Sequence, residues 1–171
     1  MTKLVCSIDT CFLIEWSRYR KRELLTKVFN YGYITEDILA EIKSEQTLEF
    51  ASKLLSSGFL VIYPFKRELE ESVRKIIETS IHDPRIRIID PPEAYALAIG
   101  LREKCIVLTE NKGVLRLVEL YHNDFPVTVW GAYELLKFLY KKGYINNFWE
   151  ELKNYTHDTH HMFPRRKLWR T

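Results

Sequence analysis

Four acidic residues lie where apolar stretches of the chain meet stretches with helical patterning: Asp9, Glu41, Glu93 and Glu110. In an open parallel sheet, ligands bind in the crevice beyond the carboxyl ends of the strands, so acids delivered to this edge by different segments converge. Converging carboxylates repel one another and raise one another's pKa unless a cation lies among them. Oxygen ligands around an open site suit Mg²⁺ or Mn²⁺. The pattern therefore indicates metal-assisted chemistry on phosphate esters.

Structural explanations compete at the first two acids. Asp9 ends a short apolar run, where an acid is often a solvated strand end or a helix cap, although Thr10 could cap the next helix equally well. Glu41 is four residues from Asp37 and from Glu45, which would place all three on one helix face. A solvated acidic face explains that spacing without a metal, and a Glu41 side chain turned toward a cation explains it with one.

The other two acids also have ordinary explanations. The segment 90–93 fits a capping box, in which Glu93 reaches back to the backbone of Asp90 at the start of a helix. A carboxylate on that first helical turn is equally well placed as a metal ligand. Glu110 and Asn111 fit a polar loop before the next helix, yet the amide oxygen of Asn111 is also a ligand for a hard metal.

Strand-like and helix-like patterns alternate along the chain. Short apolar runs predict strands over residues 4–8, 31–34, 59–63, 105–108 and 127–129. Helical spacing predicts helices over residues 10–25, 36–42, 47–55, 66–79, 91–104, 114–121, 132–141 and 145–154, with Thr35 and Asp90 as N-caps and residues 81–89 as a loop. This alternation predicts a three-layer α/β/α fold with a mostly parallel central sheet and a helical C-terminal extension.

Size and composition are those of one globular domain. The chain has 171 residues, 46% of them hydrophobic and 29% charged, and we expect a domain over residues 1–155 followed by a basic tail over 156–171. The three cysteines lack zinc-site spacing, which is typical of small buried side chains in a reducing cytoplasm. No secretory signal and no apolar stretch near the ~20 residues of a membrane span is evident, so we expect a cytoplasmic protein with no membrane partner.

One basic segment has the composition of a nucleic-acid contact. Residues 16–22 interleave aromatic rings with the cations Arg18, Arg20, Lys21 and Arg22. Such a stretch can clamp phosphates and stack bases. Cations near the negative end of a helix dipole explain the same segment as solvated surface. The net charge of +3 is too small to decide between the two.

The tail allows three interpretations. It has little apolar content and several cations, so it is either a solvated tail or a segment that folds onto RNA or a protein partner. The third interpretation is a transition-metal site formed by His157, His160 and His161.

Taken together, the acidic segments resemble the PIN domain, a family of small single-domain ribonucleases that includes the toxins of prokaryotic VapBC toxin–antitoxin systems, archaeal ones among them. The family's opening strand with its first acid is matched by residues 7–10, and its second acid by residues 40–42. Its third-acid segment is matched by residues 89–98, and its final acidic segment by residues 107–112. Its C-terminal helices are matched by residues 129–136 and 142–145. The resemblance covers roughly residues 4–155.

The resemblance implies a metal-dependent endoribonuclease that cleaves RNA phosphodiester bonds and leaves a 5′-phosphate and a 3′-hydroxyl. One or two Mg²⁺ or Mn²⁺ ions would activate the attacking water and stabilise the leaving oxygen. Asp9 and Glu93 would bind the metal directly, Glu41 would bind it or orient a water, and Glu110 with Asn111 would complete a second site. Asp9, Glu41, Glu93 and Glu110 would be the catalytic acids.

Further contacts and partners follow from the same resemblance. Thr109 and Thr10 would form hydrogen bonds with the carboxylates that bind the metal and so hold them in position. Lys112 would join the basic segment in holding RNA. The resemblance leaves open an antitoxin protein and a homodimer as protein partners.

Two positions depart from the family pattern. Pro92 stands where the subfamily has a glycine before the third acid, and Glu110-Asn111 stands where it has paired aspartates. The second departure removes one carboxylate. It favours an alternative function, a catalytically weakened PIN-like module that binds RNA or a protein.

A second alternative is an unrelated hydrolase in which Asp9 accepts a phosphoryl group. Such a mechanism uses a second aspartate two residues further on, where this chain has Cys11. No P-loop and no GxGxxG motif is present, so the sequence does not indicate a nucleotide-cofactor enzyme.

Overall fold

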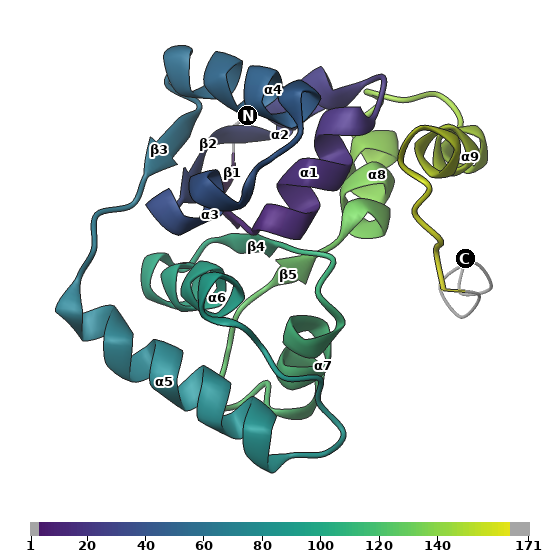
Figure 1. Ribbon diagram of the computed structural model, residues 1–171. Helices are drawn as coiled ribbons and strands as arrows, with labels where there is room; N and C mark the ends of the chain where they lie inside the picture. Colours follow the sequence, from purple (N-terminus) through teal and green to yellow (C-terminus); the bar gives the residue numbers. More distant parts are fainter. Residues whose placement is uncertain (1–3, 165–171) are drawn as a thin grey trace.

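The computed structural model describes residues 4–164 and shows an α/β fold (Figure 1). Five parallel strands form one sheet in the order β3-β2-β1-β4-β5. They are β1 (Leu4–Ile8), β2 (Phe29–Ile34), β3 (Leu60–Ile62), β4 (Ile106–Leu108) and β5 (Val129–Trp130). The α/β class and the parallel sheet expected from the sequence are confirmed.

Helices connect the strands and cover the sheet. They are α1 (Thr10–Arg18), α2 (Leu25–Val28), α3 (Glu36–Glu41), α4 (Glu45–Ser56), α5 (Arg67–His82), α6 (Pro91–Glu103), α7 (Lys112–Leu120), α8 (Ala132–Lys141) and α9 (Phe148–Thr159), with a short 3₁₀ turn, η1, at Arg22–Leu24. Within residues 4–164, no helix has both the length and the apolar character that crossing a membrane requires.

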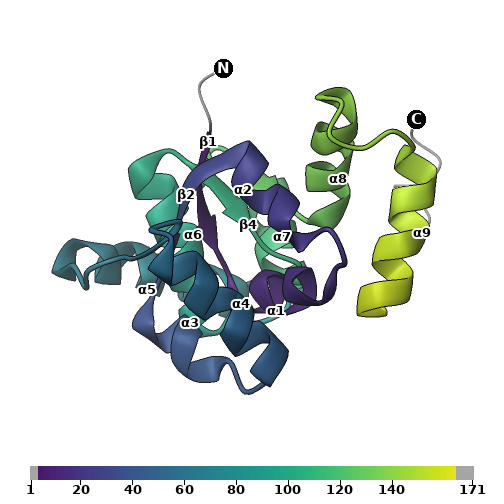
Figure 2. The ribbon, with the colours of Figure 1, turned by 90° about the horizontal axis from the view of Figure 1, so that it is seen from above.

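Two apolar cores lie on opposite faces of the sheet. One is built around Phe12 and Trp16 of α1 and continues through α4, α8 and α9. The other is built around Ile76 of α5, Leu97 of α6 and Leu117 of α7. Figure 1 shows the two groups of helices with the strands between them, and Figure 2 shows α9 outside α8. The result is the three-layer arrangement expected from the alternating patterns.

The strand order reverses between β1 and β4. The chain builds β2 and β3 outward on one side of β1, then returns to place β4 and β5 on the other side. The Asp9 N–H donates to the Leu108 carbonyl over 3.0 Å, so the carboxyl ends of β1 and β4 are adjacent. Ligands of open α/β sheets bind at this kind of reversal. The topology therefore brings Asp9 beside Thr109.

Helix α6 is packed closely on the same part of the sheet. A Cβ built at Gly100 would lie 2.1 Å from a methyl group of Val107, so only glycine allows the helix to approach β4 this closely. The Ser7 hydroxyl donates to the Ala96 carbonyl over 2.8 Å and ties the helix to β1. These contacts fix the first turn of α6, which carries Glu93, at the sheet edge.

The predicted helix over residues 10–25 is wrong beyond Arg18. Tyr19 has an extended backbone, and the chain turns there before η1 and α2. The Tyr19 hydroxyl donates to Glu151 over 2.7 Å, and the Arg20 N–H donates to Asp158 over 2.9 Å. These contacts with α9 replace the helical hydrogen bonds, which explains why local propensity did not decide the ending of α1.

The acidic helix face predicted for Asp37, Glu41 and Glu45 is not formed. Helix α3 ends at Glu41 because Ile42 adopts an extended backbone and is buried in the core. Glu45 instead opens α4. The N-cap predicted at Thr35 is confirmed, since its hydroxyl accepts a hydrogen bond from the Ile38 N–H.

At the majority of the other helix and strand ends, the observed boundary differs from the predicted one by a few residues. Helix α9 begins and ends later than predicted, and it contains the predicted boundary between residues 155 and 156. The basic residues of the tail beyond Pro164 lie outside the described part of the chain.

Candidate functional site

Asp9 is a buried carboxylate at the end of β1, with 1% of its surface exposed. It occupies the N-cap position of α1 but makes no side-chain capping bond there. Its Oδ2 accepts hydrogen bonds from the Thr109 hydroxyl at 2.6 Å and the Cys11 thiol at 2.8 Å. Its Oδ1 is buried and has no hydrogen-bond partner among the described residues. Neither a helix cap nor a solvated strand end describes this side chain.

Glu41 reaches the same region from the last residue of α3. Its carboxylate accepts a hydrogen bond from the Thr10 hydroxyl over 2.6 Å. Thr10 directly follows Asp9, and the charge of Glu41 contributes to the raised pKa of Asp9. The predicted contact of Thr10 with a candidate carboxylate is therefore present.

Glu93 comes from the first turn of α6 and takes the capping role considered for it, while its role as a metal ligand stays a prediction. One oxygen accepts a hydrogen bond from the Asp90 N–H over 3.0 Å, which completes the predicted capping box. The other accepts a hydrogen bond from the Asn111 amide. Burial raises the pKa of Glu93, and the charge of Asp9 raises it further, so the two carboxylates lie within electrostatic reach of each other.

Thr109 and Asn111 connect this group to the end of β4. The Thr109 hydroxyl donates to Asp9 and accepts from the Asn111 N–H over 2.9 Å. The predicted contact of Thr109 with a candidate ligand is thus confirmed. The Asn111 amide oxygen accepts from the Val114 N–H as the N-cap of α7, so Asn111 presents its N–H₂ group, a donor, to Glu93. Its role as a metal ligand stays a prediction that requires the amide to turn.

We use the name acidic pocket for Asp9, Glu41 and Glu93, because the charge of Glu41 acts on Asp9 and the charge of Asp9 acts on Glu93. Their carboxylate oxygens do not all lie within 4.8 Å of one another. The three members come from β1, α3 and α6, and they offer oxygen donors only. Burial is the main cause that raises the pKa of both Asp9 and Glu93, which means that their negative charges are poorly balanced within the protein. A buried carboxylate oxygen without a partner indicates a place for a water or an ion. The donor type therefore suits a hard divalent cation such as Mg²⁺ or Mn²⁺, which would have to draw the three carboxylates closer together than they lie here.

Glu110 follows Thr109 but turns toward the start of α8. One of its oxygens accepts a hydrogen bond from the Ala132 N–H. A Cβ at Gly131 would lie 2.8 Å from that oxygen, so the glycine leaves room for this contact. The other oxygen lies 3.6 Å from Nε2 of His161. An ordinary polar loop does not describe Glu110, and its role as a metal ligand stays a prediction.

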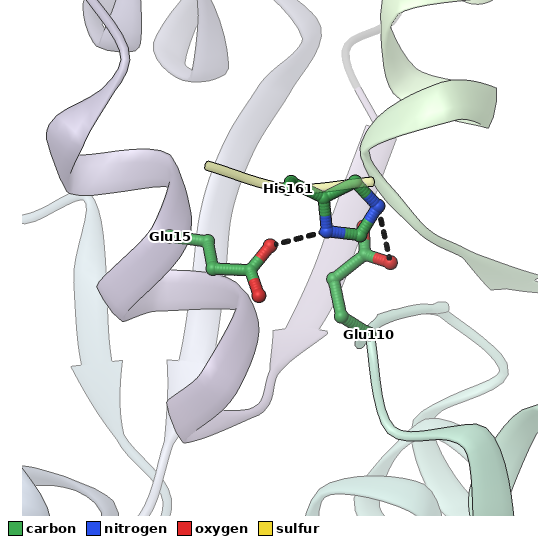
Figure 3. Close-up of side chains that lie close together, drawn as sticks. All are labelled: Glu15, Glu110 and His161. Atoms are coloured by element: carbon green, nitrogen blue, oxygen red, sulfur yellow. Dashed lines mark ion pairs between the residues drawn. The ribbon is translucent and has the colours of Figure 1, made fainter. Parts of the chain in front are cut away.

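Two residues near these acids, Cys11 and Glu15, were not predicted as site residues, and His161 was predicted only within a site of three histidines. Cys11 and Glu15 lie one helical turn apart on α1, immediately after Asp9, and this i, i+4 spacing is a signal that could have found both. His161 lies far along the chain beyond α9, and no local pattern places it beside Glu15 and Glu110 (Figure 3).

The histidines near the C-terminus do not act as a group in the described structure. His161 joins Glu15 and Glu110, whereas His160 ends α9 with a left-handed backbone and is exposed. His157 is exposed beside Asp158. The predicted alternative of a site formed by all three histidines is therefore wrong for these side-chain positions.

The aromatic residues of the basic segment belong to the core. Trp16 and Tyr19 are 0% and 1% exposed, so the predicted stacking of bases on this segment is wrong. Both rings pack against Tyr155 of α9. They are buried because α9 covers this face of α1, which the sequence does not show.

The cations of the same segment are mostly used within the protein. Arg20 pairs with Asp158 at 2.7 Å and Lys21 with Glu151 at 2.6 Å. Arg22 donates to the Ser17 carbonyl over 2.8 Å, while Arg18 is exposed. Contact of Arg18, Arg20, Lys21 and Arg22 with RNA stays a prediction, and it concerns the end of α1 opposite Asp9.

A cavity of about 360 Å³ lies beside Glu110 and His161. Its wall includes four cations, Arg85, Arg87, Lys112 and Arg116. Arg85 is paired with Asp83 at 2.6 Å and Arg116 with Glu119 at 2.8 Å. Lys112, the remaining predicted RNA contact, thus lines this cavity together with Glu110.

No family model matches this chain. No curated protein matches it either. The assignment of a function therefore depends on the geometry of the acids and on the sequence pattern.

The unbalanced charge of Asp9 leads to a prediction about stability. Because its pKa is raised, Asp9 favours folding while it is protonated, and that contribution is lost as the pH rises through the raised pKa. Asp9→Asn removes the buried charge and should stabilise the metal-free protein at pH 7 by about 1 kcal/mol, or roughly 2–4 °C in Tm. Differential scanning calorimetry in EDTA measures this shift. A lower Tm for the variant would show that the charge of Asp9 is already balanced.

Proposed function

We propose that this protein is a metal-dependent endoribonuclease with a PIN-like arrangement of acids. The observation that carries the proposal is the acidic pocket, in which Asp9 is buried with one oxygen lacking a partner and Glu93 lies within reach of its charge. Separate segments supply these carboxylates near the reversal point of the sheet, and ligands of other open α/β sheets bind at such a point, which supports the proposal.

Asp9 and Glu93 would bind Mg²⁺ or Mn²⁺ directly. Glu41 would bind the ion as well or orient a water. The cation, when bound, would supply positive charge for the scissile phosphate and lower the pKa of a water, so that the water can lose a proton and attack the phosphate. The chain's own contribution is to fix the carboxylates. Thr109 and Cys11 hold Asp9 by hydrogen bonds, and Thr10 holds Glu41.

Cys11 supports the site as a donor rather than as a nucleophile. Burial, followed by the charge of Asp9, raises the pKa of its thiol far above the usual range. The thiol therefore stays protonated at neutral pH and donates to Asp9. A covalent mechanism through Cys11 is not supported by this environment.

The cationic cavity supports a substrate that carries several phosphates. Arg87 and Lys112 line it together with Glu110, close to the end of β4 that supplies Thr109 to the acidic pocket. Cations near a metal site position a phosphate backbone without reading its sequence. RNA is the substrate that the sequence resemblance implies. In the same way, an antitoxin or a second copy of the chain remains a proposal for the protein partner.

A specific observation favours the alternative of a weakened module that binds RNA or a protein. Asn111 contributes a donor to Glu93, where a carboxylate would contribute charge to a cation. The other alternative, a phosphoryl-accepting Asp9, has less support, because Cys11 stands where such a mechanism needs a second aspartate, and its thiol donates to Asp9.

Cleavage of RNA provides the direct test. The purified full chain should cut single-stranded RNA in Mg²⁺ or Mn²⁺ and lose this activity in excess EDTA. Asp9→Asn should lower the rate by at least about 100-fold, since it removes a ligand whose charge holds the cation. Product ends should be a 5′-phosphate and a 3′-hydroxyl, as determined by labelling.

The matched control is Asp124→Asn, which makes the same change at an exposed residue paired with Lys75. This variant should cleave at the wild-type rate. Full activity of the wild-type protein in EDTA, or equal rates for the two variants, would contradict the metal mechanism. Metal-dependent RNA binding without cleavage would support the weakened module.

Asn111→Asp tests whether this position limits the activity. Aspartate can keep the cap to the Val114 N–H while replacing the amide donor to Glu93 by a charged oxygen. Affinity for Mn²⁺ and the cleavage rate should rise by at least about threefold, because metal affinity grows with ligand charge. Calorimetric titration and initial rates measure the two effects. Asn146→Asp, an exposed control, should change neither, and an unchanged Asn111→Asp would place residue 111 outside the cation's reach.

A further inference from the structure

His161 lies between two carboxylates that come from different parts of the chain (Figure 3). Its Nδ1 is 2.8 Å from an oxygen of Glu15 on α1. Its Nε2 is 3.6 Å from an oxygen of Glu110, which follows β4. The side chains of His161 and Glu110 are 15% and 12% exposed, so this contact is largely shielded from solvent.

The two distances correspond to two different interactions. At 2.8 Å, Nδ1 and Oε2 of Glu15 form a charge contact but not a hydrogen bond, because this buried oxygen has no hydrogen-bond partner among the described residues. The charge of Glu15 still favours the orientation in which Nδ1 faces α1. At 3.6 Å, Nε2 and the Glu110 oxygen are too far apart for a hydrogen bond. Two ligands at about 2.0–2.2 Å from one zinc ion are separated by roughly 3–3.6 Å. The arrangement matches a metal-binding histidine whose second nitrogen is held by a carboxylate.

The protein holds both candidate ligands in place. The His161 ring packs against Tyr155 and Phe163, with ring centroids 5.9 and 4.7 Å away. The His161 N–H donates to the Thr159 hydroxyl over 3.1 Å. Glu110 is held by the Ala132 N–H through its other oxygen. A site with fixed ligands loses less entropy when it binds an ion.

A second observation points to a ligand at this place. The Tyr155 hydroxyl is buried, the residue is 0% exposed, and the oxygen has no hydrogen-bond partner among residues 4–164. The Tyr155 ring packs against the His161 ring, so a buried hydroxyl without a partner lies close to the candidate ligand.

An ion could reach this place from solvent. Glu110 and His161 both line the cavity of about 360 Å³. The open side of that cavity leaves room for water or for a phosphate oxygen to complete the coordination of a metal.

We propose that Nε2 of His161 and a carboxylate oxygen of Glu110 bind a divalent transition metal, with Glu15 orienting the imidazole ring. The nitrogen donor selects Zn²⁺ or Mn²⁺ over Mg²⁺, which prefers oxygen ligands. This site is distinct from the acidic pocket, whose donors are all oxygens. It does not require the proposed nuclease function; if that function holds, His161 supplies the ligand that the chain lacks at Asn111.

Zinc titration of the full chain in the Asp9→Asn background isolates this site, because that change weakens the acidic pocket. Isothermal titration calorimetry should show one bound Zn²⁺. Adding His161→Gln should lower the affinity by at least about tenfold, and adding Glu15→Gln by about 10- to 100-fold. Adding His122→Ala, a control at an exposed histidine, should leave the affinity unchanged. Circular dichroism of each variant checks that the fold is retained.

Two results would overturn the proposal. One is equal Zn²⁺ affinity with and without His161→Gln or Glu15→Gln in folded protein. The other is loss of all Zn²⁺ binding on Asp9→Asn alone, which would place the ion in the acidic pocket. If the protein does not cleave RNA, the expected Zn²⁺ affinities of these variants stay the same. The titration therefore tests the zinc site independently of the proposed nuclease function.

Discussion

The burial of Asp9 at the reversal point of the sheet is the constraint on which the candidate site depends. Parallel strands β1 and β4 end side by side, and the N–H of Asp9 is bonded to the last residue of β4. The carboxylate that follows is placed in an apolar setting, where ionisation costs free energy unless a positive charge is near. The neighbouring donors offset only part of that cost. Thr109 and Cys11 donate hydrogen bonds to one oxygen of Asp9, and the other oxygen has no partner among the described residues.

Packing elsewhere in the molecule keeps the other acids near Asp9. Gly100 lets α6 sit close to β4, and the capping box at Asp90 sets the direction in which Glu93 leaves the first turn. The ending of α3 at a buried Ile42 leaves Glu41 beside Thr10. Backbone topology and apolar packing therefore keep these acids within electrostatic reach of Asp9 despite their mutual repulsion. A site built this way gives up stability to hold charge in place, as functional sites often do.

The sequence predicted the parts of the fold that depend on local pattern. The strands, the N-caps at Thr35 and Asp90 and the parallel sheet follow from periodicity and capping chemistry. The position of Asp9, Glu41 and Glu93 at junctions of elements could also be predicted, whereas their use as one metal site stays a prediction. The parts that could not be predicted depend on α9. Its contacts end α1 at Arg18, bury Trp16 and bring His161 to Glu110, and no local pattern encodes contacts between segments that lie far apart in the sequence.

The most direct test of this account is to locate manganese in crystals of the full chain grown with Mn²⁺. An anomalous difference map should show a peak in contact with the carboxylates of Asp9 and Glu93, and crystals of Asp9→Asn should lack it. A second peak at Glu110 and His161 is compatible with the account. A well-ordered wild-type structure with no manganese at Asp9, or with the Asp9 oxygen bonded to a protein donor instead, would contradict it.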